Sequence, residues 1–180
     1  MNRTCEQCAK RIPLPHRPDA RYCSSACRQR AYRQRRRPLP VELTSRPRWV
    51  CWELQERRGR TAKVPLTIFG TAASVTDPRT WATYEKVRAA SDRVGIVLGD
   101  GLGCIDLDHC VADGVIAPWA RGVIAQHRAD AYLVELSPSG TGVHIFLPMG
   151  EAPGRKIRDG EVQMEIYSRA RFMTVTGRRI

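Results

Sequence analysis

The sequence Cys104-Ile105-Asp106-Leu107-Asp108 alternates apolar and acidic side chains, and the expected fold is built outward from it. Side chains alternate across a β-strand, so Asp106 and Asp108 share one face, whereas Ile105 points to the other face and toward a core. Two adjacent carboxylates repel each other and are tolerated mainly beside a cation or in water. Their oxygen atoms suit magnesium or manganese. Because exposed carboxylates are common on strands, this pair alone is weak evidence for catalysis.

Two later segments repeat this layout. In residues 143–147, His144 lies opposite an apolar row, and in residues 162–167, Glu165 lies opposite Met164 and Ile166. If the three strands are neighbours in one sheet, the two aspartates, the glutamate and the histidine converge on one face. Three carboxylates there form a cage for two divalent ions, and the histidine can donate a hydrogen bond to a triphosphate.

A glycine-rich loop precedes the histidine strand at residues 137–142, where the sequence is SPSGTG. Glycine lets the backbone approach a ligand closely, and the hydroxyls of Ser139 and Thr141 add groups that can bind a nucleotide. An ordinary hairpin loop between strands at 132–136 and 143–147 explains the same residues. Both interpretations stay open.

The remaining pattern predicts an α+β fold with helices on one side of a sheet. The turn Gly99-Asp100-Gly101 joins two short strands, and a hairpin ends the chain. The expected strands are 94–98, 103–109, 132–136, 143–147, 162–167 and 172–176, and the expected helices are 79–90 and 116–128.

Four of the seven cysteines form two close pairs near the N-terminus. Cys5 and Cys8 are separated by two residues, and Cys23 and Cys27 by three. Paired cysteines at such spacing are typical of a tetrahedral structural zinc site. The competing interpretation is a set of unrelated buried thiols. A unit this small has few large apolar side chains, so we expect zinc to supply much of its folding free energy and chelation to unfold residues 1–30 alone.

A basic segment follows the cysteines and has no proline before Pro38, so it can continue as a helix. Residues 1–48 hold 13 Lys and Arg against 3 Asp and Glu, which accounts for most of the net charge of +12. Such a block favours nucleic acid, through contacts to phosphates; a solvated charged face is the alternative. The arginines expected to bind DNA are Arg28, Arg30, Arg33, Arg35, Arg36 and Arg37.

Composition and proline content set the expected organisation. Hydrophobic residues make up 42% of the chain, enough for a core, and no apolar run approaches the roughly 20 residues that cross a bilayer. We therefore expect a soluble, intracellular protein with no membrane partner. Three units are predicted: a zinc finger with an arginine-rich helix at 1–37, a proline-containing linker at 38–48 and a catalytic domain at 49–180.

Together these motifs resemble the archaeo-eukaryotic primase superfamily, in particular the phage and plasmid bifunctional primase-polymerases. The resemblance rests on Asp106-Leu107-Asp108, on the loop at 137–142 with His144, and on residues 165–177, within about residues 47–180. It implies an RRM-like catalytic sheet, Mg²⁺ or Mn²⁺ bound by Asp106, Asp108 and Glu165, and nucleotide binding by His144 with Arg169 or Arg171. The family often has serine where this chain has Gly142, so Ser139 or Thr141 is expected to supply that hydroxyl.

The expected function is template-directed nucleotidyl transfer, as a DNA primase or polymerase in DNA replication. The implied partners are a single-stranded DNA template, NTPs or dNTPs, and a replicative helicase or a separate primase subunit. The implied location is the cytoplasm of a bacterium or a phage-infected host. Two alternatives stay open. One is a metal-dependent nuclease, although His109 and His144 are not paired as in nickases. The other is a non-catalytic, zinc-containing DNA-binding accessory protein of replication.

Overall fold

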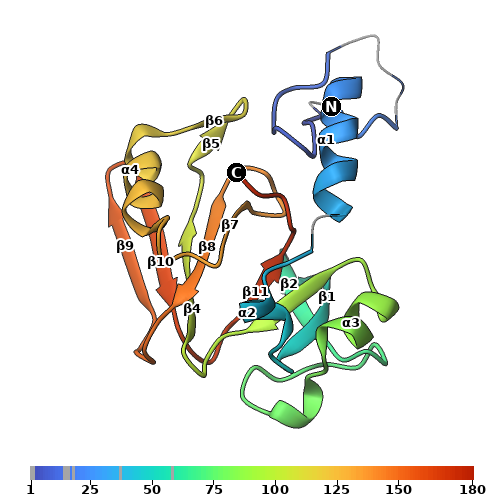
Figure 1. Cartoon of the computed structure of the whole chain (residues 1–180), viewed down its shortest axis with the longest axis vertical. Coiled ribbons are helices and arrows are strands. Elements are labelled where there is room, and N and C mark those ends of the chain that lie inside the picture. Colours follow the sequence, from blue (N-terminus) through green and yellow to red (C-terminus); the bar gives the residue numbers. More distant parts are fainter. Residues whose placement is uncertain (1–2, 14–16, 18, 37, 58) are drawn as a thin grey trace.

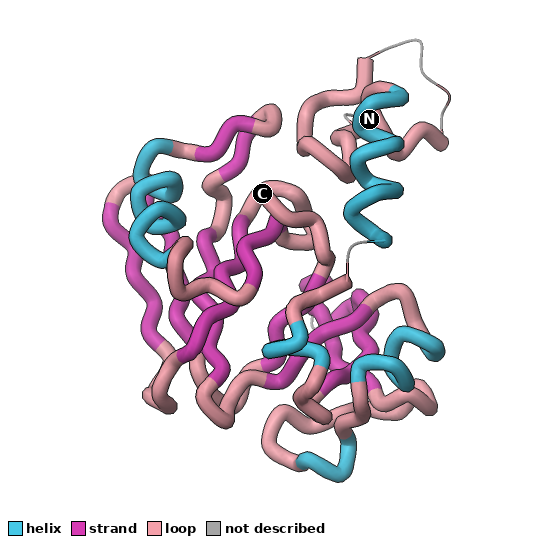
Figure 2. The backbone as a smooth tube through the Cα atoms, viewed as in Figure 1, coloured by secondary structure: helices cyan, strands magenta, loops and turns pink. Residues whose placement is uncertain are grey.

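Two antiparallel β-sheets lie side by side in the computed structural model, with the N-terminal unit beyond one end of them (Figure 1). The structure describes residues 3–13, 17, 19–36, 38–57 and 59–180. Most of the regular structure is strand, and the helices are few and short (Figure 2). The predicted α+β class is confirmed, but the single sheet expected from the sequence is wrong, because the strands divide between two sheets.

The larger sheet has five strands and contains every strand predicted to carry an acidic residue or the histidine. Their order is β7 (Leu133–Leu136), β8 (Val143–Pro148), β4 (Leu102–Leu107), β10 (Val162–Tyr167) and β9 (Arg155–Asp159). Both β4 and β7 are antiparallel to β8, so they run parallel to each other with β8 between them. Because α4 (Pro118–His127) connects them, β4, α4 and β7 form a split β-α-β unit.

Helix α4 covers the apolar face of this sheet. Ile105, Val143 and Ile145 pack in one buried cluster with Ala120 and Ile124 of α4. Pro118 begins the helix at a position where its missing N–H costs nothing. The odd-numbered apolar row of β4 therefore faces the helix, as the alternation predicts, and the even-numbered row is left for the opposite face.

The smaller sheet has four strands. Their order is β11 (Phe172–Val175), β3 (Val94–Val97), β1 (Trp49–Arg57) and β2 (Arg60–Leu66). Trp49 is fully buried, and its indole N–H donates to the Leu43 carbonyl with an N–O distance of 3.1 Å. One buried cluster includes Trp49 and Ile96 from this sheet together with Leu102 and Phe146 from the larger sheet. The two sheets thus share a core.

Short helices and one hairpin complete the described chain. The predicted helix at 79–90 is a 3-10 turn followed by a helix, because Ala82 between them pairs with Trp49 in a β-bridge. The elements are α1 (Ser25–Arg36), α2 (Val41–Thr44), η1 (Pro78–Thr80), α3 (Tyr84–Ala90), β5 (Val111–Ala112) and β6 (Val115–Ile116).

The predicted terminal hairpin is wrong. β10 pairs with β4 and β9, whereas β11 pairs with β3 in the other sheet. Close packing accounts for the choice of partner, since a Cβ on Gly95 would lie 2.9 Å from Cδ2 of Phe172. The turn at 99–101 likewise joins strands of different sheets, β3 and β4. Sequence adjacency predicted a partner in each case. All four residues of β3 are buried, so the backbone N–H and C=O groups on both of its edges need strand partners, which β1 and β11 provide.

Candidate active site and zinc cluster

A row of ionisable side chains crosses the larger sheet on the face opposite α4. The strand registers pair Glu135 with His144, His144 with Asp106, Asp106 with Glu165, and Glu165 with Lys156. The expectation that the strands of the histidine, aspartate and glutamate are neighbours is therefore confirmed. His144 is nearly enclosed, with its Nε2 3.6 Å from Oδ1 of Asp106 and its Nδ1 3.5 Å from Oε1 of Glu135.

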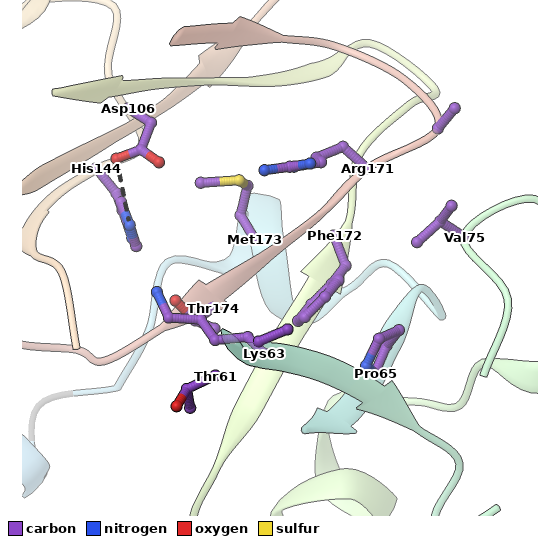
Figure 3. Close-up of a pocket in the computed structure, with 12 residues that line it drawn as sticks. Thr61, Lys63, Pro65, Val75, Asp106, His144, Arg171, Phe172, Met173 and Thr174 are labelled. Atoms are coloured by element: carbon purple, nitrogen blue, oxygen red, sulfur yellow. Dashed lines mark ion pairs between the residues drawn. The ribbon is translucent and has the colours of Figure 1, made fainter. Parts of the chain in front are cut away.

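A cleft of about 560 Å³ opens beside this row, between the two sheets (Figure 3). Asp106 and His144 face it from the larger sheet, and Lys63 faces it from β2. The segment from Ala170 to Thr174 forms another wall and brings Arg171 to the cleft. One carboxylate, an imidazole and two cationic side chains thus line one space large enough for a small ligand.

The electrostatics around Asp106 favour an added cation. Burial raises the pKa of the Asp106 carboxyl, and the negative charges of Asp108 and Glu165 raise it further, against the opposing effects of His144 and Lys63. Burial also lowers the pKa of Lys63, although the charges of Asp106 and Asp108 oppose that shift. Burial and the neighbouring carboxylates thus make the charged form of Asp106 unfavourable, and a bound cation would offset that effect.

Glu165 already has partners within the protein. Its Oε1 lies 2.8 Å from Lys156 Nζ, and its Oε2 accepts a hydrogen bond of 2.7 Å from the Tyr167 hydroxyl. Arg158 and Arg171 lie at 3.5 and 4.0 Å. Burial by itself raises the pKa of Glu165, but the hydrogen bonds from Lys156 and Tyr167 outweigh it and the pKa is lowered. These ion pairs keep the carboxylate ionised.

Asp108 lies just beyond the end of β4 rather than within it. Its backbone N–H donates to the Gln163 carbonyl at 2.9 Å, and the next residue, His109, turns the chain with φ of 50°. Within the described ranges, Asp106, Asp108 and Glu165 do not form a group of ligand atoms close enough for a shared ion; the four cysteines do. Asp108 is nevertheless close enough for its charge to act on both Asp106 and Lys63.

The glycine-rich loop is closed on itself. Ser139 Oγ lies 3.0 Å from Ser137 Oγ and 2.9 Å from Thr141 Oγ1, and Ser139 and Thr141 are exposed outside the cleft lining. Gly142 has no room for a side chain, since a Cβ there would lie 2.7 Å from the Leu107 carbonyl oxygen. Close strand packing therefore explains why this chain lacks the serine that the resembled family often has. Arg169 is likewise exposed and does not line the cleft.

The four N-terminal cysteines converge as the spacing predicts. Their sulfur atoms all lie within 4.8 Å of one another, and the Cys8–Cys23 and Cys23–Cys27 sulfur distances are both 3.6 Å. Four ligands at the usual Zn–S length of about 2.3 Å would have sulfurs roughly 3.8 Å apart in a tetrahedron. All four are free thiols rather than disulfides. The cluster therefore has the ligands and the spacing of a structural zinc site.

Thiol chemistry in the cluster also favours a metal. Burial opposes ionisation of Cys5, but hydrogen bonds from the backbone N–H groups of Cys23 and Gln7 lower its pKa to about 7. Burial raises the pKa of Cys8 to about 12, and hydrogen bonds among the neighbouring thiols add to that shift. Ionisation of one thiol thus disfavours ionisation of its neighbours, and a bound cation would offset the repulsion between the thiolates.

The cysteine unit docks onto the larger sheet. Nη1 of Arg178 donates to the Glu6 carbonyl at 2.5 Å, and the same guanidinium donates to the Ser137 carbonyl at the start of the glycine-rich loop. Ala9 belongs to the core cluster of α4 and β8. Gly114, at the tip of the β5–β6 hairpin, lies against the Cys8 backbone, where a Cβ would meet the carbonyl oxygen at 2.2 Å.

The predicted basic helix is α1. The side chains of Arg28, Arg30 and Arg33 are exposed on it, whereas Ala31 is buried. Of the other predicted DNA contacts, Arg35 and Arg36 lie on the last turn of α1 with side chains outside the described structure, and Arg37 lies outside the described residues.

Three residues of the site were missed from the sequence. Lys63 and Lys156 lie on strands that meet the carboxylates only through sheet pairing and packing, so local patterning gives no signal for them. Glu135 does have a signal, because it interrupts the otherwise apolar strand Leu133–Leu136.

A scan with protein-family models gives no match for this chain, and a search of curated proteins gives no significant match. The resemblance to primase-polymerases therefore rests on the motifs themselves. None of the described helices is long and apolar enough to span a bilayer.

Proposed function

We propose that this protein is a template-directed nucleotidyltransferase of the primase-polymerase type, acting in DNA replication. The observation that carries the proposal is the row of His144, Asp106 and Glu165 across three adjacent strands. Asp106 and His144 of this row line a cleft together with Lys63 and Arg171. Such a set combines oxygen ligands for divalent ions with cationic groups for a triphosphate.

The topology of the larger sheet supports this proposal. The split β4-α4-β7 unit is followed by β8, which inserts between its strands, and by β10, which lies on the far side of β4. This is the order of a β-α-β-β-α-β unit, with β9 where the second helix would stand. An RRM-like sheet of this kind is what the resemblance implies for the catalytic domain.

The residues divide into two roles. We assign Asp106, Asp108 and Glu165 to divalent ions and His144, Lys63 and Arg171 to the nucleotide phosphates. Bound magnesium or manganese would stabilise the charge that develops on the attacking and leaving oxygens during transfer. Because Lys156 occupies Oε1 of Glu165, ion binding requires this carboxylate to exchange its ion pair. Ser139, Thr141 and Arg169, which lie outside the cleft, are left without a role in this assignment.

The N-terminal unit is assigned to the template. A structural zinc ion would hold the cysteine unit, and the exposed arginines of α1 would contact phosphates of single-stranded DNA without reading its sequence. A replicative helicase or a separate primase subunit in the cytoplasm of a bacterial or phage-infected cell is the partner that this function requires.

The test is product formation by the purified protein. Primed and unprimed single-stranded DNA is incubated with NTPs or dNTPs and with Mg²⁺ or Mn²⁺. Extended or newly made strands are expected, and Asp106→Ala should abolish them while DNA binding is kept. Asp92→Ala is the matched control, because it removes an exposed carboxylate that pairs only with Arg88 in the described contacts.

The alternatives give different products. Shortened DNA that depends on Asp106 would indicate a nuclease, and DNA binding without any product would indicate an accessory protein. Full activity of Asp106→Ala would contradict the site assignment.

A further inference from the structure

Glu135 on β7 is a fully buried carboxylate that the proposed chemistry does not use. It lies directly beside His144 in the strand register, on the side away from Asp106. A buried charge is expensive unless hydrogen bonds and opposite charges compensate it. The groups that compensate the charge of Glu135 therefore indicate the role of this carboxylate.

Most hydrogen bonds to the buried Glu135 carboxylate come from backbone N–H groups of the chain after β11. Thr176 N–H donates to both oxygens of Glu135, at 2.9 and 3.1 Å, and Gly177 N–H donates to Oε2 at 2.7 Å. Glu135 thus connects β7 of the larger sheet to the end of β11, the strand of the smaller sheet that lines the cleft. The carboxylate holds the two walls of the cleft in one relative position.

The positive charge of Arg178 also compensates Glu135, and the carboxylate lies beside the imidazole of His144 as well. Nδ1 of His144 lies 3.5 Å from Oε1 of Glu135, at ion-pair distance. It has no hydrogen-bond partner among the described residues, although the side chain is almost completely buried, so the carboxylate beside it is the acceptor that the geometry offers. Nε2 faces Asp106 and the cleft. A carboxylate that accepts the Nδ1 proton of a histidine fixes which ring nitrogen is free to act on a ligand.

We propose that Glu135 is a positioning residue: it accepts the Nδ1–H of His144, keeps Nε2 directed into the cleft, and anchors the chain directly after β11, the strand that lines the opposite wall. This role adds to the nucleotidyl transfer proposed above. Only its expected kinetic effect rests on that proposed function; the position of the proton on His144 does not. A ring that holds Nδ1–H has Nε2 free to take up a proton, and it can then donate that proton to an anionic oxygen, as the histidine of a serine protease does toward its leaving group.

The decisive measurement is ring-nitrogen NMR of the protein without nucleotide. In the wild type, two-bond ¹H–¹⁵N correlations should show a protonated Nδ1 on His144. In Glu135→Gln, the amide oxygen should be taken by the Thr176 and Gly177 N–H groups. The introduced NH₂ would then face the ring, so Nδ1 should lose its proton and become an acceptor. Glu85→Gln is the matched control, because Glu85 is exposed on α3.

The kinetic consequence is measured on the same variants. Glu135→Gln should raise the KM for nucleotide by roughly tenfold and change kcat less, as expected when one charge-assisted hydrogen bond to the substrate is weakened. A change confined to kcat would contradict the positioning role.

The outcomes separate the two proposals. A wild-type ring protonated only on Nε2 overturns the inference even if Glu135→Gln does not fold. A ring that keeps Nδ1–H in a folded Glu135→Gln protein overturns it as well. A wild type with protonated Nδ1 but no nucleotidyl transfer leaves the positioning role intact and removes the proposed function.

Discussion

The cysteine unit and the carboxylate row are two candidate metal sites, and they are built in opposite ways. The four cysteine sulfurs already lie within 4.8 Å of one another, and backbone N–H groups donate to Cys5. In the row, Glu165 is held by Lys156 and Tyr167, and His144 lies between two carboxylates. The first site has its four ligands gathered around one point, whereas the second has protein groups in the places where ions would act.

This difference follows from what holds each site together. The cysteine unit has few large apolar residues, so its ligands must be brought together largely by the metal. The row lies on a sheet whose other face is buried under α4, so its geometry exists without any ion. The comparison predicts that metal removal unfolds the first site and leaves the second folded. The following four experiments test that contrast, beginning with the largest expected effect.

Cys23→Ser should abolish zinc binding and the fold of the cysteine unit, because it removes one of four ligands whose joint binding is worth on the order of 10 kcal/mol. Bound zinc is measured by elemental analysis, and order by ¹H–¹⁵N correlation spectra. The signals of the two sheets should persist. Cys51→Ser is the control, since Cys51 is buried outside the cluster. Dispersed signals from residues 3–13 in a zinc-free protein would show that the cysteine unit folds without metal and would contradict the predicted difference between the two sites.

Combined replacement of Arg28, Arg30 and Arg33 by alanine should weaken binding of single-stranded DNA. Three lost phosphate contacts should reduce the slope of log K against log salt by about 2. Fluorescence anisotropy over a salt series measures both quantities. The same triple change should leave zinc content and nucleotide KM unaltered, and an unchanged salt slope would show that α1 does not carry the DNA contact.

Arg178→Ala should destabilise the protein by about 2 kcal/mol, because loss of the guanidinium leaves the Glu6 carbonyl without this donor and the Ser137 carbonyl with the Gly140 N–H alone. Hydrogen exchange should rise in the cysteine unit and in the loop at 137–142 together. Arg60→Ala, at an exposed position on β2, is the comparison variant. Faster exchange in the cysteine unit alone would mean that the two regions are not coupled through Arg178.

Asp106→Asn should stabilise the protein slightly at pH 7 when no divalent ion is added. The pKa of Asp106 is raised above its ordinary value of 3.8, so the folded state disfavours the charged form, and stability falls as pH rises through that pKa. The gain should vanish in acid. Thermal unfolding should show Tm higher by a few degrees, a gain of about 1 kcal/mol. Added Mn²⁺ should then raise the Tm of the wild type but not of the variant; equal responses would remove Asp106 from the ion site.

Local pattern predicted the parts of the site that depend on a single strand. Alternation identified Asp106, His144 and Glu165 as members of rows opposite an apolar face, and the structure places them side by side. Local pattern failed to predict strand pairs whose members are far apart in the sequence. Residues 172–176 were assigned to a hairpin with β10, but β11 pairs with β3, because Phe172 packs closely over Gly95 and β3 needs a strand on each edge.

The sequence by itself determined the cysteine ligands, the basic helix and the side of each strand that would be polar, because these depend on neighbours within a few residues. Only the tertiary structure decided that Glu135 lies beside His144, that Lys156 pairs with Glu165, that Lys63 faces the row across a cleft, and that Arg178 joins the cysteine unit to the glycine-rich loop. These contacts arise from strand register and sheet packing, which are set by burial of the whole core rather than by any one segment.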